Sequence, residues 1–193
     1  MTNYLILHGF GGSTGGHWQE WLAQRLQQQK KAVWFPQFTN WNYPDKATWL
    51  TQLQSVLAEI PKDEPLHVIT HSLGCILWLH YAACPTARKV ARVTFVSPPA
   101  HDTAIRELQS FFPVPTDHQI LKKSAEQVLL ITATNDPYLP PDKWGDYMTC
   151  SVPVLILPGA GHINVAANFG AWPWMLTHCL SENAAPLDSV LVR

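Results

Sequence analysis

The stretch from Leu66 to Tyr81 changes from one kind of secondary structure to another within a few residues. Residues 66–70 form a short apolar run that predicts a buried β-strand. After Ser72, apolar residues recur at helical spacing until Pro85 ends the pattern. A strand that turns directly into a helix places Ser72 at a sharp elbow, at the N-terminus of that helix.

The rest of the chain repeats this alternation of short apolar strands and helical segments. Strands are predicted at residues 4–7, 32–35, 66–70, 91–97, 127–133 and 152–157. Helical segments are predicted at about residues 18–31, 46–60, 73–81, 103–111, 142–148 and 172–180. Parallel neighbours need such crossovers, and right-handed crossovers dominate. The order therefore predicts an α/β fold, a three-layer α/β/α sandwich with a mostly parallel six-stranded sheet.

Length and composition fit one globular domain. The 193 residues, of which 47% are hydrophobic and 14% charged, suffice for one well-buried core and are too few for two. We expect residues 1–180 to form this domain. Residues 181–193 show no clear periodicity, and we expect them to form a loosely packed C-terminal tail.

Charge and the start of the chain exclude several classes of partner. A formal charge of −1 provides no basic field for nucleic acid. The first residues lack a positive region, and the apolar run at 4–7 is too short for a signal peptide or a membrane span. The four cysteines lie far apart, as is usual in a reducing compartment. We therefore expect a cytoplasmic protein with no nucleic-acid or membrane partner, and nothing in the sequence indicates a protein partner.

The nine histidines raise the question of a metal site. The sequence contains no HxH, HExxH or Cys/His cluster, so it predicts neither a metal nor a cofactor. His71, beside the elbow, is expected to be a packed residue rather than a base. His8 and His17 are expected to shape the loop after the first strand.

Four segments that follow directly after predicted strands contain the candidate functional residues Phe10, Ser72, Asp136 and His162. The carboxyl ends of parallel strands meet at one edge of a sheet, and ligands bind beyond that edge. We therefore expect these residues to lie close together. The order serine, acid, histidine along the chain is the order found in α/β-hydrolases.

The chemistry of serine hydrolysis explains why these residue types belong together. A serine hydroxyl is a poor nucleophile at neutral pH, so it needs a base, and the base needs a carboxylate that fixes its tautomer. Ser72, His162 and Asp136 can fill these three roles. The backbone N–H groups of Phe10 and Leu73 can bind the oxyanion. The hypothesis is a serine hydrolase that cleaves an ester, thioester or related acyl bond of a small molecule.

Trp41 is the one tryptophan that we expect near the substrate pocket, because it stands in a loop that follows a strand.

Each candidate also has a simpler interpretation. Ser72 can be an ordinary helix N-cap, Asp136 a turn residue before a proline, and His162 an exposed polar histidine. Thr70 stands where the usual G-x-S-x-G elbow has its first glycine, so the elbow must tolerate some crowding. Two other functions are open: a binding protein that keeps a vestigial triad on a hydrolase fold, and a peptidase.

Four groups of residues together resemble a known family. They are His8-Gly9-Phe10 with His17-Trp18 and Trp21; His71-Ser72-Leu73-Gly74-Cys75; Asp136-Pro137-Tyr138; and Gly161-His162-Ile163-Asn164 with Gly170, Trp172 and Pro173. Over nearly the whole chain, the sequence resembles the small serine hydrolases related to retinoblastoma-binding protein nine and its bacterial YdeN-type relatives. The resemblance implies a compact α/β-hydrolase fold without a cap, and a triad at Ser72, Asp136 and His162.

Overall fold

A computed structural model describes residues 1–115, 117, 119–148 and 152–181, and its centre is one six-stranded sheet. The strands are β1 (Asn3–Leu7), β2 (Val33–Trp34), β3 (Leu66–His71), β4 (Val90–Val96), β5 (Ala125–Ala133) and β6 (Val154–Leu157). They lie in the order β2-β1-β3-β4-β5-β6, and every neighbouring pair is parallel. The predicted parallel six-stranded sheet is confirmed.

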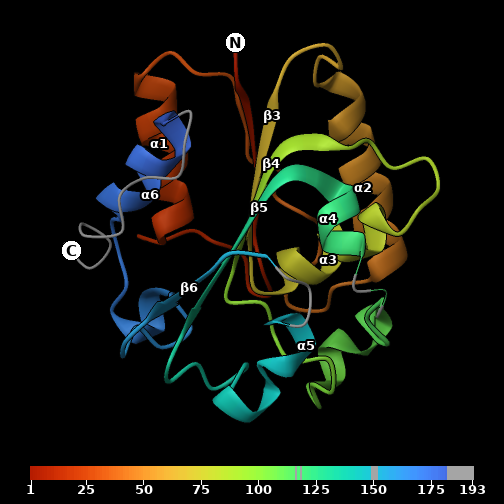
Figure 1. The fold of residues 1–193 in the computed structure, drawn as a ribbon, viewed down its shortest axis with the longest axis vertical. Coiled ribbons are helices and arrows are strands. Elements are labelled where there is room, and N and C mark those ends of the chain that lie inside the picture. The colour runs from red at the N-terminus through yellow and green to blue at the C-terminus, as the bar shows by residue number, and fades with distance from the viewer. Residues whose placement is uncertain (116, 118, 149–151, 182–193) are drawn as a thin grey trace.

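Helices cover both faces of the sheet, which confirms the three-layer arrangement (Figure 1). One face carries α1 (Trp18–Gln28) and α6 (Pro173–Leu180). The other face carries α2 (Lys46–Glu59), α3 (Leu73–Ala82) and the short α4 (Ile120–Ser124). The remaining described helices are α5 (Gly145–Met148) and the 3₁₀ helices η1 (Arg106–Phe111), η2 (Pro141–Lys143) and η3 (Val165–Ala167).

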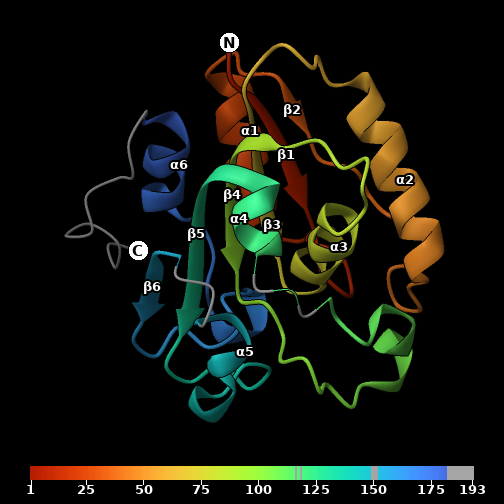
Figure 2. The same cartoon turned by 45° about the vertical axis from the view of Figure 1, so that its right-hand side comes forward.

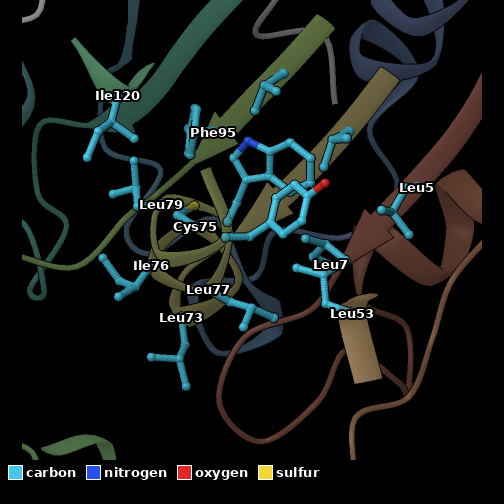
Figure 3. Close-up of a cluster of buried hydrophobic side chains, with 14 of the residues drawn as sticks. Leu5, Leu7, Leu53, Leu73, Cys75, Ile76, Leu77, Leu79, Phe95 and Ile120 are labelled. Atoms are coloured by element: carbon cyan, nitrogen blue, oxygen red, sulfur yellow. The ribbon is translucent and has the colours of Figure 1, made fainter. Parts of the chain in front are cut away.

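Strand β1 is almost entirely apolar because both of its faces are buried. Successive side chains of a strand point to opposite faces of a sheet. In β1, Tyr4 and Ile6 therefore pack with the core beneath α1 and α6, whereas Leu5 and Leu7 pack with the core beneath α2 and α3. Figure 3 shows the second core, in which side chains of α3 lie close to Leu5 and Leu7.

Helix α3, which follows the elbow, is apolar on nearly every side. Its buried side chains are Leu73, Cys75, Ile76, Leu77, Trp78, Leu79 and Tyr81. A helix that is apolar all round has to be covered all round, and α3 contacts β3, α2 and α4. It spans only 10 residues. None of the described helices is long and apolar enough to cross a membrane.

The structure differs from the sequence-based expectations in the short elements. The helix expected at 103–111 is the 3₁₀ helix η1, which begins only at Arg106, and the helix expected at 142–148 is divided into η2 and α5. Helix α4 was not predicted. Elements of one turn contain too few residues to show a helical period, so their sequences resemble loops. From residue 182 onward, the expected C-terminal tail lies outside the described residues.

We predict that Gly74→Ala destabilises the fold. A Cβ at Gly74 would lie 2.7 Å from the carbonyl oxygens of both Leu7 and His8, closer than real Cβ contacts. The backbone at the end of β1 would have to shift, which lowers the free energy of unfolding by about 1–3 kcal/mol. Urea unfolding measures this loss. The control is Gly145→Ala, where an added Cβ meets no atom within 4 Å; equal losses in both variants would contradict the prediction.

Candidate active site

Ser72 stands in a strained backbone conformation between β3 and α3. Its φ is 51° and its ψ is −122°, a region that costs a non-glycine residue about 1–3 kcal/mol. The side chain makes no capping hydrogen bond to α3; its Oγ instead lies 2.9 Å from Nε2 of His162. The interpretation of Ser72 as an ordinary N-cap is therefore wrong.

Asp136 follows the end of β5 and is almost completely buried. Its Oδ1 accepts a hydrogen bond of 2.9 Å from the N–H of Tyr138, so it does shape the turn. Its Oδ1 and Oδ2 also lie 3.0 and 2.9 Å from Nδ1 of His162. The turn therefore orients the Asp136 carboxylate toward the His162 imidazole.

His162 joins the other two side chains. It lies in the loop after β6 and is only 7% exposed, so the interpretation as an exposed polar histidine is wrong. The Asp136 carboxylate facing Nδ1 favours the tautomer with its proton on Nδ1. Nε2 is then free to accept the proton of the Ser72 hydroxyl. The three side chains form one continuous line of hydrogen bonds at the carboxyl edge of the sheet.

The loop after β1 is in close contact with the elbow at Ser72. A Cβ at Gly9 would lie 2.8 Å from Cβ of Ser72, so only glycine allows this approach. Gly11 and Gly12 donate their N–H groups to the carbonyls of Trp41 and Gly9, whereas the N–H of Phe10 has no acceptor in the part of the chain that the structure describes. Leu73 is the first residue of α3, so its N–H has no acceptor within the helix. Two backbone donors without an acceptor among the described residues therefore lie on the two segments that meet at Ser72.

His8 sets the orientation of the peptide between Gly9 and Phe10. The N–H of Phe38 donates to Nε2 of His8 at 2.9 Å, so the proton of the neutral ring is on Nδ1. Nδ1 then donates to the carbonyl of Gly9 at 2.7 Å. Burial lowers the pKa of His8, which favours this neutral form. Because the Gly9 carbonyl and the Phe10 N–H belong to one peptide, His8 aims that N–H.

Two side chains hold the carbonyl groups of the histidine loop. Nε2 of His71 lies 2.9 Å from the carbonyl of His162, and the indole N–H of Trp18 donates to the carbonyl of Ile163 at 2.9 Å. Ile163 has a φ of 48°, which is unusual for a β-branched residue, so the loop needs such support. His71 is thus the packed residue that the sequence predicted, and it connects the elbow to the loop of His162.

A third contact comes from the residue before the acid. Oδ1 of Asn135 accepts a hydrogen bond of 2.8 Å from the N–H of Gly161. The residues immediately before Ser72 and before Asp136 therefore both bond to the backbone of the loop that carries His162. No role for Asn135 was predicted from the sequence. An asparagine between a strand end and a candidate acid is the signal, since its short amide side chain bonds readily to nearby backbone.

The histidines around the site are kept neutral. Burial lowers the pKa of His71 well below its usual value, and the neighbouring imidazoles of His162 and His17 lower it further. Burial likewise lowers the pKa of His17 to about 4, with a smaller effect of His162. The rings of His17, His71 and His162 follow one another with centroids 4.9 and 5.0 Å apart. His71 and His17 therefore act as hydrogen-bonding and packing groups, not as cations.

Thr70 fits into the elbow without approaching Ser72. Its hydroxyl lies 3.3 Å from the carbonyl of Thr94 and 3.1 Å from Sγ of Cys75, so the side chain points toward β4 and the start of α3. The close approaches at the elbow are made by Gly9 and Gly74 instead. The Thr70 side chain that was expected to crowd the elbow is accommodated between β3, β4 and α3.

Trp41 lies beside the loop after β1. Its ring carbons are 3.2–3.5 Å from where a Cβ on Gly12 would stand. It also lines a hollow of about 380 Å³ formed by residues 37–42. Its contact with substrate stays a prediction.

The sequence profile of the family described as serine hydrolase matches residues 4–180. The chain belongs to the serine hydrolase family. YdeN of Bacillus subtilis, whose name describes it as a hydrolase, is 28% identical over 143 residues, which cover 72% of this chain and 74% of YdeN.

Solved structures of this group share the fold. The crystal structure of the B. subtilis ydeN gene product matches with a TM-score of 0.81 and 22% identity, covering 93% of this chain and 97% of that one. A YdeN-like hydrolase of Pectobacterium atrosepticum matches with a TM-score of 0.69 and 20% identity, covering 92% and 88%. The resemblance of this serine hydrolase to YdeN-type proteins and its α/β-hydrolase fold are confirmed. The likeness to retinoblastoma-binding protein nine stays a prediction.

We predict that Ser72→Gly is more stable than Ser72→Ala by about 1 kcal/mol. Both variants lose the hydrogen bond to His162, but only glycine relieves the strain at positive φ, and this outweighs its greater freedom in the unfolded chain. Chemical denaturation measures the difference. Ser55, in the middle of α2, is the control, because there the glycine variant is expected to be the less stable one. The same order of stability at both positions would contradict the strain at Ser72.

Proposed function

We propose that this protein hydrolyses ester, thioester or related acyl bonds of small molecules through a Ser72-His162-Asp136 triad. The observation that carries the proposal is the unbroken line of hydrogen bonds from Ser72 Oγ through both ring nitrogens of His162 to Asp136. Membership of the serine hydrolase family supports hydrolysis as the reaction class.

In the first half of the reaction, Ser72 Oγ attacks the substrate carbonyl while Nε2 of His162 takes the hydroxyl proton. Asp136 holds Nδ1–H and stabilises the imidazolium that forms. His162 then gives the proton to the leaving oxygen or sulfur. The bond to the leaving group breaks, and the acyl group stays on Ser72.

In the second half, water replaces the leaving group. His162 takes a proton from the water, whose oxygen attacks the acyl carbonyl, and then returns the proton to Ser72 Oγ. In each half the carbonyl oxygen becomes negative. The N–H groups of Phe10 and Leu73 are the donors that we assign to it, because they have no acceptor in the described part of the chain and lie on the segments that meet at Ser72.

Labelling with a fluorophosphonate probe tests the proposal. We expect the probe to modify Ser72, as read by mass spectrometry, and Ser72→Ala to lower turnover of an activated ester by at least about three orders of magnitude. The control is Ser97→Ala. Ser97 also stands after a strand, with a φ of 47°, and its hydroxyl has no partner among the described residues.

The outcomes separate this proposal from its alternatives. A folded protein whose Ser72 stays unmodified, and whose activity is unchanged in Ser72→Ala, would overturn the triad and favour a binding protein on a hydrolase fold. Faster cleavage of peptide amides than of esters with the same acyl group would favour a peptidase.

We also predict that Asn135→Ala lowers kcat/KM about ten-fold by loosening the loop of His162. Asn135 is exposed, so the variant is expected to fold normally. Thr134→Val is the matched control, because the Thr134 hydroxyl accepts an equivalent hydrogen bond of 3.0 Å from Gly159, earlier in the same loop. Steady-state kinetics and thermal unfolding of both variants are the measurements. Equal losses of activity, or a loss that follows the loss of stability, would show that Asn135 supports only the fold.

A further inference from the structure

We infer that a hollow beside Tyr138 is the subsite for the leaving group, and that it takes an apolar or aromatic alcohol or thiol. The inference rests on the proposed function. The hollow has a volume of about 460 Å³, enough for a ring with a short linker. Most of its lining comes from Ala100, Ala104, Ile105, Pro137, Tyr138 and Pro140.

Two segments of the chain form the walls of this hollow. One is the stretch 100–105 after β4, and the other is the stretch 137–143 after β5. The N–H of Ala100 donates to the carbonyl of Tyr138 at 2.8 Å, so the two walls are joined. Both segments lie below the carboxyl ends of the strands in Figure 2. Asp136, which follows β5, belongs to the same edge of the sheet.

Tyr138 connects the hollow to the proposed triad. Its ring meets the imidazole of His162 edge to face, with centroids 4.5 Å apart, and is 41% exposed. The same residue lines the hollow. Tyr138 is therefore the residue through which the hollow adjoins His162.

The reaction geometry decides which part of the substrate points there. In the tetrahedral intermediate, the oxyanion faces the backbone donors, whereas the leaving atom must lie within hydrogen-bond reach of Nε2 of His162 to receive its proton. His71 packs against the buried side of the His162 ring. Of the rings in contact with His162, His71 is buried whereas Tyr138 is exposed, so we place the leaving group on the side of Tyr138, in the hollow that Tyr138 lines.

The charges at the hollow favour an uncharged group. Asp102 and Lys143 both line it, and they form an ion pair with each other. Their charges cancel locally, so no unpaired charge of the lining is available to a charged alcohol. The rest of the lining is aliphatic or aromatic, apart from the hydroxyls of Thr103 and Tyr138. Apolar surface of the leaving group gains by leaving water here.

The test uses acetate esters, which all form the same acetyl-enzyme. Benzyl and methyl acetate release alcohols of similar acidity, so a difference in kcat/KM reports binding of the leaving group during acylation. We expect benzyl acetate to be favoured about ten-fold. Ala104→Phe, at an exposed alanine of the lining, fills the hollow and is expected to bring the ratio of kcat/KM between benzyl and methyl acetate down to about one.

Two controls assign the subsite to the leaving group. Ala58→Phe adds the same ring at an exposed alanine near the end of α2 and is expected to leave the benzyl preference intact. With methanol as the constant leaving group, the ratio between methyl phenylacetate and methyl acetate is expected to be the same in Ala104→Phe as in the natural chain. A change in that ratio instead would place the acyl group in the hollow and overturn the inference, as would an unchanged benzyl preference.

Binding of benzyl alcohol to Ser72→Ala tests the subsite without catalysis. We expect saturable shifts of the amide resonances of Ala104 and Tyr138 on titration, and their loss when Ala104→Phe is added. If the natural chain cleaves no ester but these shifts occur, the proposed function fails and the binding site stands. If esters are cleaved through Ser72 but the shifts and the benzyl preference are both absent, the inference alone fails.

Discussion

The close contact between the loop after β1 and the elbow at Ser72 is the constraint on which the rest of the site depends. It requires the absence of a side chain at two positions, because a Cβ at Gly9 would collide with Ser72 and one at Gly74 would collide with the end of β1. The contact lies at the carboxyl ends of β1 and β3, which are neighbours in the sheet. From β1 the chain continues to β2 on one side of this pair, and from β3 it continues to β4 on the other side. This is the point of an α/β sheet at which two loops separate and leave room for a ligand. The elbow thus presents its hydroxyl where the donors of Phe10 and Leu73 lie.

Around this contact, neutral histidines orient the backbone of the loops that form the site. Each of His8 and His71 is buried and bonded to a backbone carbonyl of one of the loops of the site. Burial lowers their pKa values, so they keep one donor and one acceptor instead of becoming cations. A neutral imidazole can fix a peptide without placing a charge beside His162. In the proposed reaction, His162 is then the imidazole that changes its protonation state.

Backbone strain is present at the proposed site. Ser72, which bonds to His162, and Ile163, which follows His162 in the chain, both have positive φ values. Such conformations persist only where the surroundings determine them, here through the bonds from His71, Trp18 and Asn135. Helix α3 and strands β1 and β3 supply the rigid support, since both strands and most of the helix are buried.

The sequence by itself determined the strands, the long helices, the parallel sheet and the set Ser72, Asp136 and His162. Strands that are buried on both faces are continuously apolar, long helices show their period, and residues after parallel strands must meet at one edge. Helix α4 was not predicted, and the helix predicted at 103–111 is the shorter η1, because elements of one or two turns show no clear period. Only the tertiary structure decided that Thr70 is accommodated, that His71 and Asn135 hold the histidine loop, and that a hollow opens beside Tyr138. Each of these depends on distances between segments remote in the chain, and such distances are set by the packing of the whole sheet rather than by any local pattern.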